Sequence, residues 1–114
     1  MQRSQRLNRR QQFSALYRYG TRVDTVSFSV IYRQNHLAIS RFATVVNRRF
    51  GTAVRRNKVK RVARSLFNEV QRKIAPACDL LVLPKITMLT QKHAELVSDF
   101  ERALEAAELF RGQP

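Results

Sequence analysis

The sequence predicts a single α+β domain with the order helix, two or three strands, long helix, strand, helix. Three observations support this order. Apolar residues recur at helical spacing from Val59 to Val70. Apolar and polar residues alternate, as in a β-strand, from Val26 to Arg33. Residues 80–83 form a continuous apolar run of strand length. A long helix between strands is a crossover connection, so we expect an α-β-β-β-α-β-α two-layer sandwich with a mixed sheet.

The first predicted element is a short helix over residues 7–20. Capping residues are expected at both ends: Asn8 with Gln11 at the start, and Gly20 at the end. Phe13, Leu16 and Tyr17 form a narrow apolar face. Such a face usually belongs to the core, but aromatic rings along a groove also stack on nucleobases in single-strand binders. The pattern alone leaves both interpretations open.

Strands and a last helix account for most of the remaining chain. A short strand is expected around Val23, and residues 36–46 should form the next strand or pair of strands. The last helix is expected to run from a cap at Thr90 to about Phe110. Tyr32 is either a tyrosine at the edge of the core or a platform for a base. The acidic residues of the last helix are interpreted as a solvated face.

The long central helix carries a dense basic surface. Thr52 can cap this helix, and Gly51 allows a tight turn before it. Four polar residues fall in one stripe opposite the apolar side: Asn57, Lys60, Arg61 and Arg64. Lys60 and Arg64 repel each other at i,i+4 spacing, and no acid precedes Glu69 on the helix. We therefore expect a polyanion, and not solvent alone, to compensate this charge.

Composition favours an anionic partner for the whole chain. The chain of 114 residues has a formal net charge of +14. Residues 1–74 carry 18 basic and 2 acidic side chains, whereas residues 75–114 carry 4 and 6. No apolar run reaches the roughly 20 residues of a membrane span, and the start lacks the apolar region of a signal peptide. With a single cysteine, we expect a cytoplasmic protein formed by residues 1–114, with residues 1–6 as a flexible tail.

The residues at the start of the central helix identify a family. The pattern Gly51-x-Ala53-Val54-x-Arg56-Asn57-x-x-Lys60-Arg61-x-x-Arg64 resembles the arginine–asparagine–arginine signature of the bacterial ribonuclease P protein subunit. The preceding Val46-Asn47-Arg48-Arg49 stands where that family usually has a strand ending in Ser-Lys-Lys. Ser65 and Asn68 depart from its usual Glu and Arg. The resemblance spans roughly residues 6–110 and is specific over 46–64.

The resemblance implies an accessory protein that acts together with an RNA subunit. In this family the RNA subunit is the catalyst. The holoenzyme removes the 5′ leader of precursor tRNA by Mg²⁺-dependent hydrolysis, with the ion held through the RNA and substrate. Contacts to RNA are implied for Arg48, Arg49, Arg55, Arg56, Asn57, Lys58, Lys60, Arg61 and Arg64. Phe13 and Tyr17, with Tyr32 on the sheet, are implied to line a cleft for the single-stranded leader. The family also has a left-handed crossover around its long helix.

The residues themselves suggest no catalytic site and no metal site in the protein. The basic half contains only Asp24 and Glu69 as carboxylates, and neither histidine has a ligand at metal-binding spacing. We expect the catalytic RNA and precursor tRNA as partners, no membrane and no obligate protein partner. Three alternatives are a small ribosomal protein, a DNA-binding regulator and a membrane-surface module. Sequencing the RNAs that co-purify with the chain would discriminate most sharply among them.

Overall fold

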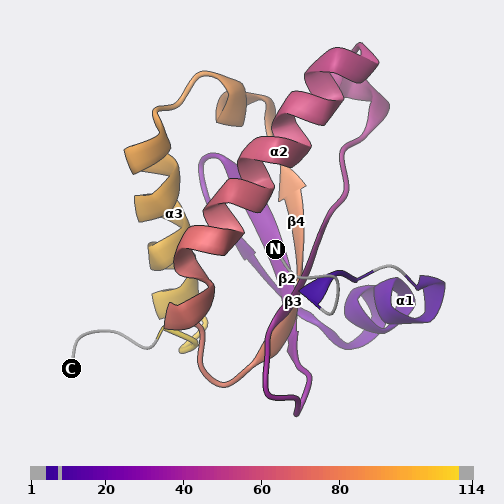
Figure 1. Cartoon of the computed structure of the whole chain (residues 1–114), viewed down its shortest axis with the longest axis vertical. Helices are drawn as coiled ribbons and strands as arrows, with labels where there is room; N and C mark the ends of the chain where they lie inside the picture. Colours follow the sequence, from indigo (N-terminus) through magenta and orange to yellow (C-terminus); the bar gives the residue numbers. More distant parts are fainter. Residues whose placement is uncertain (1–4, 8, 111–114) are drawn as a thin grey trace.

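The computed structural model describes residues 5–7 and 9–110. Its helices are α1 (Arg10–Tyr19), α2 (Ala53–Val70) and α3 (His93–Ala106) (Figure 1). Its strands are β1 (Thr21–Asp24), β2 (Phe28–Gln34), β3 (Arg41–Thr44) and β4 (Cys78–Pro84). Short 3₁₀ turns include η2 (Arg48–Phe50) and η4 (Ile86–Leu89). The predicted class and element order are confirmed. None of the helices in the described ranges is long and apolar enough to span a bilayer.

The four strands form one mixed sheet in the order β1-β2-β4-β3. β2 pairs antiparallel with both β1 and β4, whereas β3 pairs parallel with β4. The parallel pair requires a crossover, which α2 supplies. In Figure 1, α2 lies in front of the sheet and both strands run upward, with β4 to the left of β3. This crossover is therefore left-handed, against the usual preference, as the family resemblance implied.

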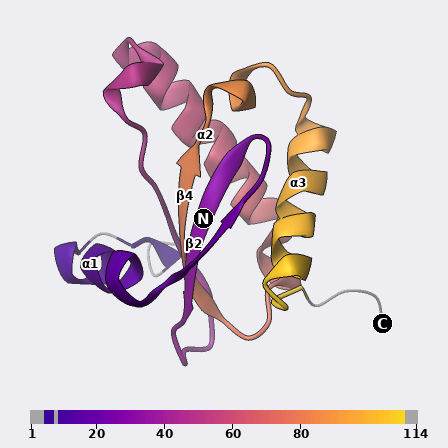
Figure 2. The ribbon, with the colours of Figure 1, turned by 180° about the vertical axis from the view of Figure 1, so that it is seen from behind.

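Helices cover both faces of the sheet, which is a fuller layering than the expected two layers. Phe28, Val30, Leu80 and Val82 join the buried residues of α2 and α3 in the larger core. On the other face, Ile31 and Leu81 pack with Leu16 of α1. Strand residues alternate between these faces because successive side chains point in opposite directions. Figure 2 shows β2 and β4 from behind, with α2 beyond them and α3 to their right.

The ends of α1 differ from the prediction. The helix begins at Arg10, and its capping box joins Arg9 to Gln12; the predicted Asn8 lies outside the described residues. Gly20 follows the helix with an extended φ of −75°, so it is not a left-handed cap. Glycine is required there by space instead. A Cβ would lie 2.4 Å from the carbonyl oxygen of Leu16 and 2.7 Å from Cγ2 of Ile31.

Two other predicted segments, residues 36–46 and the last helix, also have different boundaries in the structure. Residues 36–46 contain one strand, β3, preceded by a turn in which the Asn35 side chain accepts a hydrogen bond from the backbone N–H of Leu37. Thr90 does not cap α3, since the N-cap is Lys92. The Thr90 hydroxyl donates to the carbonyl of Thr87 and closes η4. Thr90 lies two residues before the actual N-cap, Lys92, so the predicted cap was wrong by two positions. The expected short strand around Val23 is present as β1.

The start of the chain packs against the sheet edge. Of the expected tail 1–6, residues 1–4 lie outside the described residues. Gln5 is buried and its side-chain amide donates to the Gln71 side chain. Arg6 forms a parallel bridge with Phe42 of β3, and the Leu7 N–H donates to the Phe42 carbonyl at 2.9 Å. Arg6 and Leu7 therefore pair with the outer edge of β3 through one isolated bridge.

Candidate nucleic-acid interface

Local capping fixes the approach to α2. The Asn47 side chain accepts a hydrogen bond from the Arg49 N–H at 2.8 Å and starts η2, which leaves Arg48 and Arg49 exposed. Gly51 then takes a φ of 93°, a left-handed value that favours glycine. The Thr52 hydroxyl accepts from the Arg55 N–H at 3.3 Å and caps α2. The cap and turn predicted from the sequence are confirmed.

One side of α2 is buried in the core. Five of its residues are buried: Val59, Ala63, Leu66, Phe67 and Val70. The Phe67 ring stacks on Phe42 with centroids 4.7 Å apart and planes at 13°. Stacked pairs of this kind add about 0.5–1.5 kcal/mol to the burial of the rings. This packing turns the polar stripe outward, where Asn57, Lys60, Arg61 and Arg64 are exposed along with Arg55 and Lys58.

The cations of residues 48–64 have no carboxylate partners within the described ranges. Acids that lie near α2 pair elsewhere: Glu69 contacts His93 Nε2 at 2.7 Å, and Glu101 contacts Lys73 at 2.5 Å. Arg56 is half-buried, and its buried Nε makes no hydrogen bond with any described residue. We call the exposed or half-exposed cations of residues 48–64, together with Asn57, the basic surface. Its positive potential is not offset locally, so it attracts polyanions.

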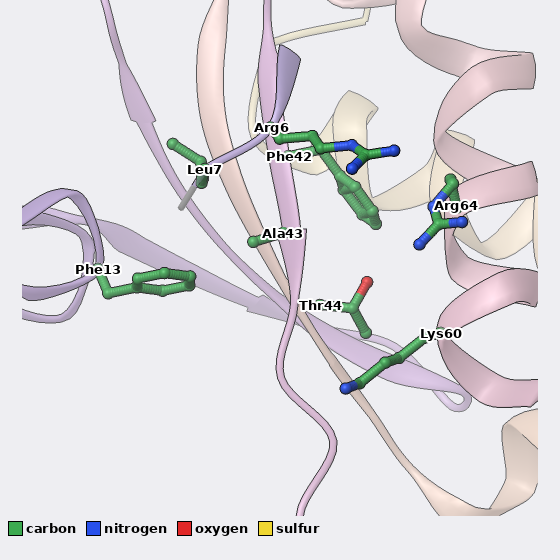
Figure 3. A pocket seen from close by; sticks show the side chains of 8 residues that line it. All are labelled: Arg6, Leu7, Phe13, Phe42, Ala43, Thr44, Lys60 and Arg64. Atoms are coloured by element: carbon green, nitrogen blue, oxygen red, sulfur yellow. The ribbon is translucent and has the colours of Figure 1, made fainter. Parts of the chain in front are cut away.

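A groove runs between α1 and α2 across β3. Its lining residues are Arg6, Leu7, Phe13, Phe42, Ala43, Thr44, Lys60 and Arg64. Figure 3 shows the Phe13 ring reaching toward β3 from α1, with Arg6, Lys60 and Arg64 on the opposite side. The hollow measures about 230 Å³, below the 300–1,000 Å³ typical of small-molecule pockets. The groove is therefore small for an enclosed small-molecule substrate.

The structure brings only some of the predicted aromatic residues to this groove. Phe13 lines it and is half-buried against the α1-side core. Tyr17, one turn later on α1, is 56% exposed and does not line the groove. Tyr32 packs into the core on the opposite face, beside Val30 and Phe100 of α3. Phe13 thus lines the same groove as Lys60 and Arg64. Tyr17 is exposed nearby on α1, and Tyr32 lies away from the groove.

Sequence reasoning missed part of this site. Arg6, Leu7 and Thr44 line the groove, but Arg6 was assigned to a flexible tail and Thr44 carried no signal. Arg6 and Leu7 reach the groove only because they pair with β3. The basic character of Arg6 was visible in the sequence, although its position was not.

The described side chains of the basic surface and the groove are mainly cations and apolar groups. Among them, no group of three or more His, Cys, Asp or Glu side chains is arranged to hold a metal ion. Burial raises the pKa of the Cys78 thiol to about 11, so the sulfur stays protonated at neutral pH and is a poor nucleophile. The site can therefore bind phosphates through its cations and bases through its aromatic rings.

Comparisons with known proteins agree with this geometry. The family model described as Ribonuclease P matches residues 1–108. A Thermotoga maritima ribonuclease P protein component is 35% identical over 100 residues, covering 88% of this chain and 79% of the relative. The solved RNase P protein from Thermotoga maritima superimposes with a TM-score of 0.76 at 27% identity, covering 96% of this chain and 98% of that one. The Staphylococcus aureus RNase P protein gives 0.79 at 26% identity, with 93% and 97% covered. This chain therefore belongs to the ribonuclease P protein family.

Proposed function

We propose that this chain is the protein subunit of ribonuclease P and binds both the catalytic RNA and the 5′ leader of precursor tRNA. Membership of the family places the chain in tRNA 5′-end processing, as a subunit of an endoribonuclease that associates with an RNA subunit. The single observation that carries the binding proposal is the basic surface. Its cations lack carboxylate partners in the described structure and face solvent beside the groove between α1 and α2.

The two RNA partners are proposed to use different parts of the site. The basic surface contacts the catalytic RNA through residues Arg48, Arg49, Arg55, Arg56, Asn57, Lys58, Lys60, Arg61 and Arg64. Arginine forks suit phosphate oxygens, and the exposed positions of most of these residues support this role. The single-stranded leader lies in the groove, where Phe13 and the nearby Tyr17 stack on its bases. Lys60 and Arg64 border the groove and so can hold the leader backbone as well.

Catalysis is proposed to reside in the RNA. The described residues offer carboxylates mainly as ion-pair partners, such as Asp79 with Arg41 and Glu101 with Lys73. Mg²⁺ would accordingly be held by the RNA and the substrate, and the protein would contribute binding and orientation. Precursor tRNA is the proposed substrate, and the cytoplasm is the proposed location.

Reconstitution tests this function directly. The purified chain alone should cleave no precursor tRNA, whereas mixing it with the catalytic RNA should restore 5′-end maturation at physiological Mg²⁺. An Arg61→Ala/Arg64→Ala variant should lower this restoration, and Lys92→Ala, which removes a cation at the start of α3, should not. Cleavage by rigorously RNA-free protein would refute the assignment of catalysis to the RNA.

A further inference from the structure

A second cluster of cations lies at the end of α1, away from residues 48–64. The Tyr19 ring is 63% exposed. The guanidinium carbon of Arg18 lies 5.7 Å from the centroid of this ring, and that of Arg33 lies 5.1 Å from it. Arg18 and Tyr19 come from the last turn of α1, and Arg33 comes from β2. One exposed ring therefore gathers two arginines from different elements.

These two arginines differ from their neighbours in having no acidic partner in the described part of the chain. Arg22 on β1 pairs with Asp24 at 3.0 Å. Arg41 on β3 donates two hydrogen bonds to Asp79, both at 2.7 Å. The guanidiniums of Arg18 and Arg33 instead lie against the Tyr19 ring. Cation–π contacts contribute about 0.5–1 kcal/mol at exposed sites, which orients the guanidiniums without neutralising them.

An open groove with polar groups adjoins this cluster at Arg33, between α1 and the turn after β2. Arg18 and Tyr19 do not line it, and it contains the Arg41–Asp79 ion pair. Gln11, Gln34 and His36 also line it. Their side chains can donate hydrogen bonds to phosphate or ribose oxygens. Charge, donors and exposure therefore occur together, as an RNA backbone requires.

The cluster lies apart from the Phe13 groove. β4 separates β2 from β3 in the sheet, and the Phe13 groove follows β3. The two sites also flank α1 on different sides, because Phe13 lines one groove while Gln11 and Ala15 line the other. A single strand lying along β3 would not cover both sites, whereas a large folded RNA could straddle α1.

We propose that Arg18, Tyr19 and Arg33 form a second phosphate-binding site, which takes the backbone of the RNA subunit. This inference rests on the proposed function, since it assumes that the chain binds that RNA. In it, Tyr19 holds the two guanidiniums in place, and each guanidinium forks onto phosphate oxygens. The RNA subunit thus contacts the protein on both flanks of α1.

Salt-dependent binding tests the site. An Arg18→Ala/Arg33→Ala variant should bind the RNA subunit more weakly, and the slope of log K against log[salt] should shrink by roughly 0.7–0.9 for each phosphate that is no longer neutralised. Lys92→Ala removes a cation at the start of α3 and should leave the slope unchanged. Tyr19→Phe keeps the ring and should bind like the unaltered protein, whereas Tyr19→Leu should weaken binding roughly two- to fivefold. Circular dichroism would confirm that each variant is folded.

The outcomes separate this inference from the proposed function. An unchanged slope in Arg18→Ala/Arg33→Ala, alongside a reduced slope in Arg61→Ala/Arg64→Ala, would overturn the second site and leave the proposed function intact. Weaker binding of leader-bearing precursor tRNA alone, with unchanged affinity for the RNA subunit, would also overturn it by assigning the cluster to the substrate. If the unaltered protein failed to bind the RNA subunit, the proposed function itself would fall.

Discussion

Helices α2 and α3 pack side by side on the same face of the sheet (Figure 1), but they present opposite charges to solvent. Both bury a regular apolar stripe, including Phe67 on α2 and Phe100 on α3. The cations of α2 have no acidic partner among the described residues. In contrast, Asp99 of α3 contacts Ser27 and Arg102, and Glu101 contacts Lys73.

The difference shows that each helix packs into the core through one face, while a separate, exposed face is available for binding. Packing against one sheet demands similar apolar stripes from both helices, so their buried faces are alike. The exposed faces are not constrained by packing. The exposed face of α2 concentrates uncompensated positive charge beside a groove, whereas that of α3 carries Glu95 and Glu105 together with Glu101, which pairs with Lys73. The two helices are therefore expected to contribute equally to the core and unequally to binding.

The largest expected effect tests whether the buried faces of α2 and α3 contribute equally to the free energy of unfolding. Phe67→Ala and Phe100→Ala should each lower the free energy of unfolding by about 3–5 kcal/mol, because each removes a fully buried ring and leaves a cavity. Each change also removes an aromatic pair, with Phe42 in one case and with Phe28 in the other. Chemical denaturation would measure both effects. A cost below about 1 kcal/mol for either variant would contradict a shared core role.

The next largest effect tests whether RNA binds the exposed face of α2 and not that of α3. Arg61→Ala/Arg64→Ala should weaken RNA binding and reduce the magnitude of the salt slope by roughly 0.7–0.9 per phosphate contact. A matched pair of changes on α3, Glu95→Gln/Glu105→Gln, should leave the slope nearly unchanged because these acids lie on the other helix. Filter binding over a range of salt concentrations would measure both. A change of similar size and opposite sign in the α3 variant, which raises the net charge where the α2 variant lowers it, would indicate a response to net charge instead of a localised interface.

A smaller effect distinguishes base stacking by α1 from the charge of α2. Tyr17→Ala should cost about 1–3 kcal/mol of affinity for leader-bearing precursor tRNA and leave the salt slope nearly unchanged. Tyr17 is exposed, so its removal should not disturb folding, whereas Phe13 is half-buried and its variants need a folding check. Mature tRNA, which lacks leader bases, serves as the control substrate. Unchanged relative affinity for the two tRNAs would show that the leader runs elsewhere.

The smallest effect concerns stability without RNA. Sulfate or phosphate should raise the melting temperature by several degrees more than sodium chloride at matched ionic strength, since anions bind the folded state at the basic surface. Differential scanning fluorimetry would measure this shift. The extra stabilisation should decrease in Arg61→Ala/Arg64→Ala and persist in Lys92→Ala. Identical melting curves in the three salts would point to screening alone.

The sequence by itself determined the elements and the chemistry of the basic surface. The periodicity of α2, the Thr52 cap and the Gly51 turn all lie within a contiguous stretch, and helical spacing converts such a stretch directly into faces. The absence of acids between Arg48 and Asn68 was also visible in the sequence, and so was the family signature. These features depend on residues close together in the chain, so they need no knowledge of the fold.

Tertiary structure decided which of these residues meet. Arg6 reaches the groove only because its segment pairs with β3, and Tyr32 leaves it because alternation places that residue on the α3 side of β2. The cluster around Tyr19 likewise joins α1 to β2 across a sequence gap that no local pattern spans. Strand pairing and the handedness of the crossover set these contacts. Both depend on packing between distant segments, which local periodicity does not encode.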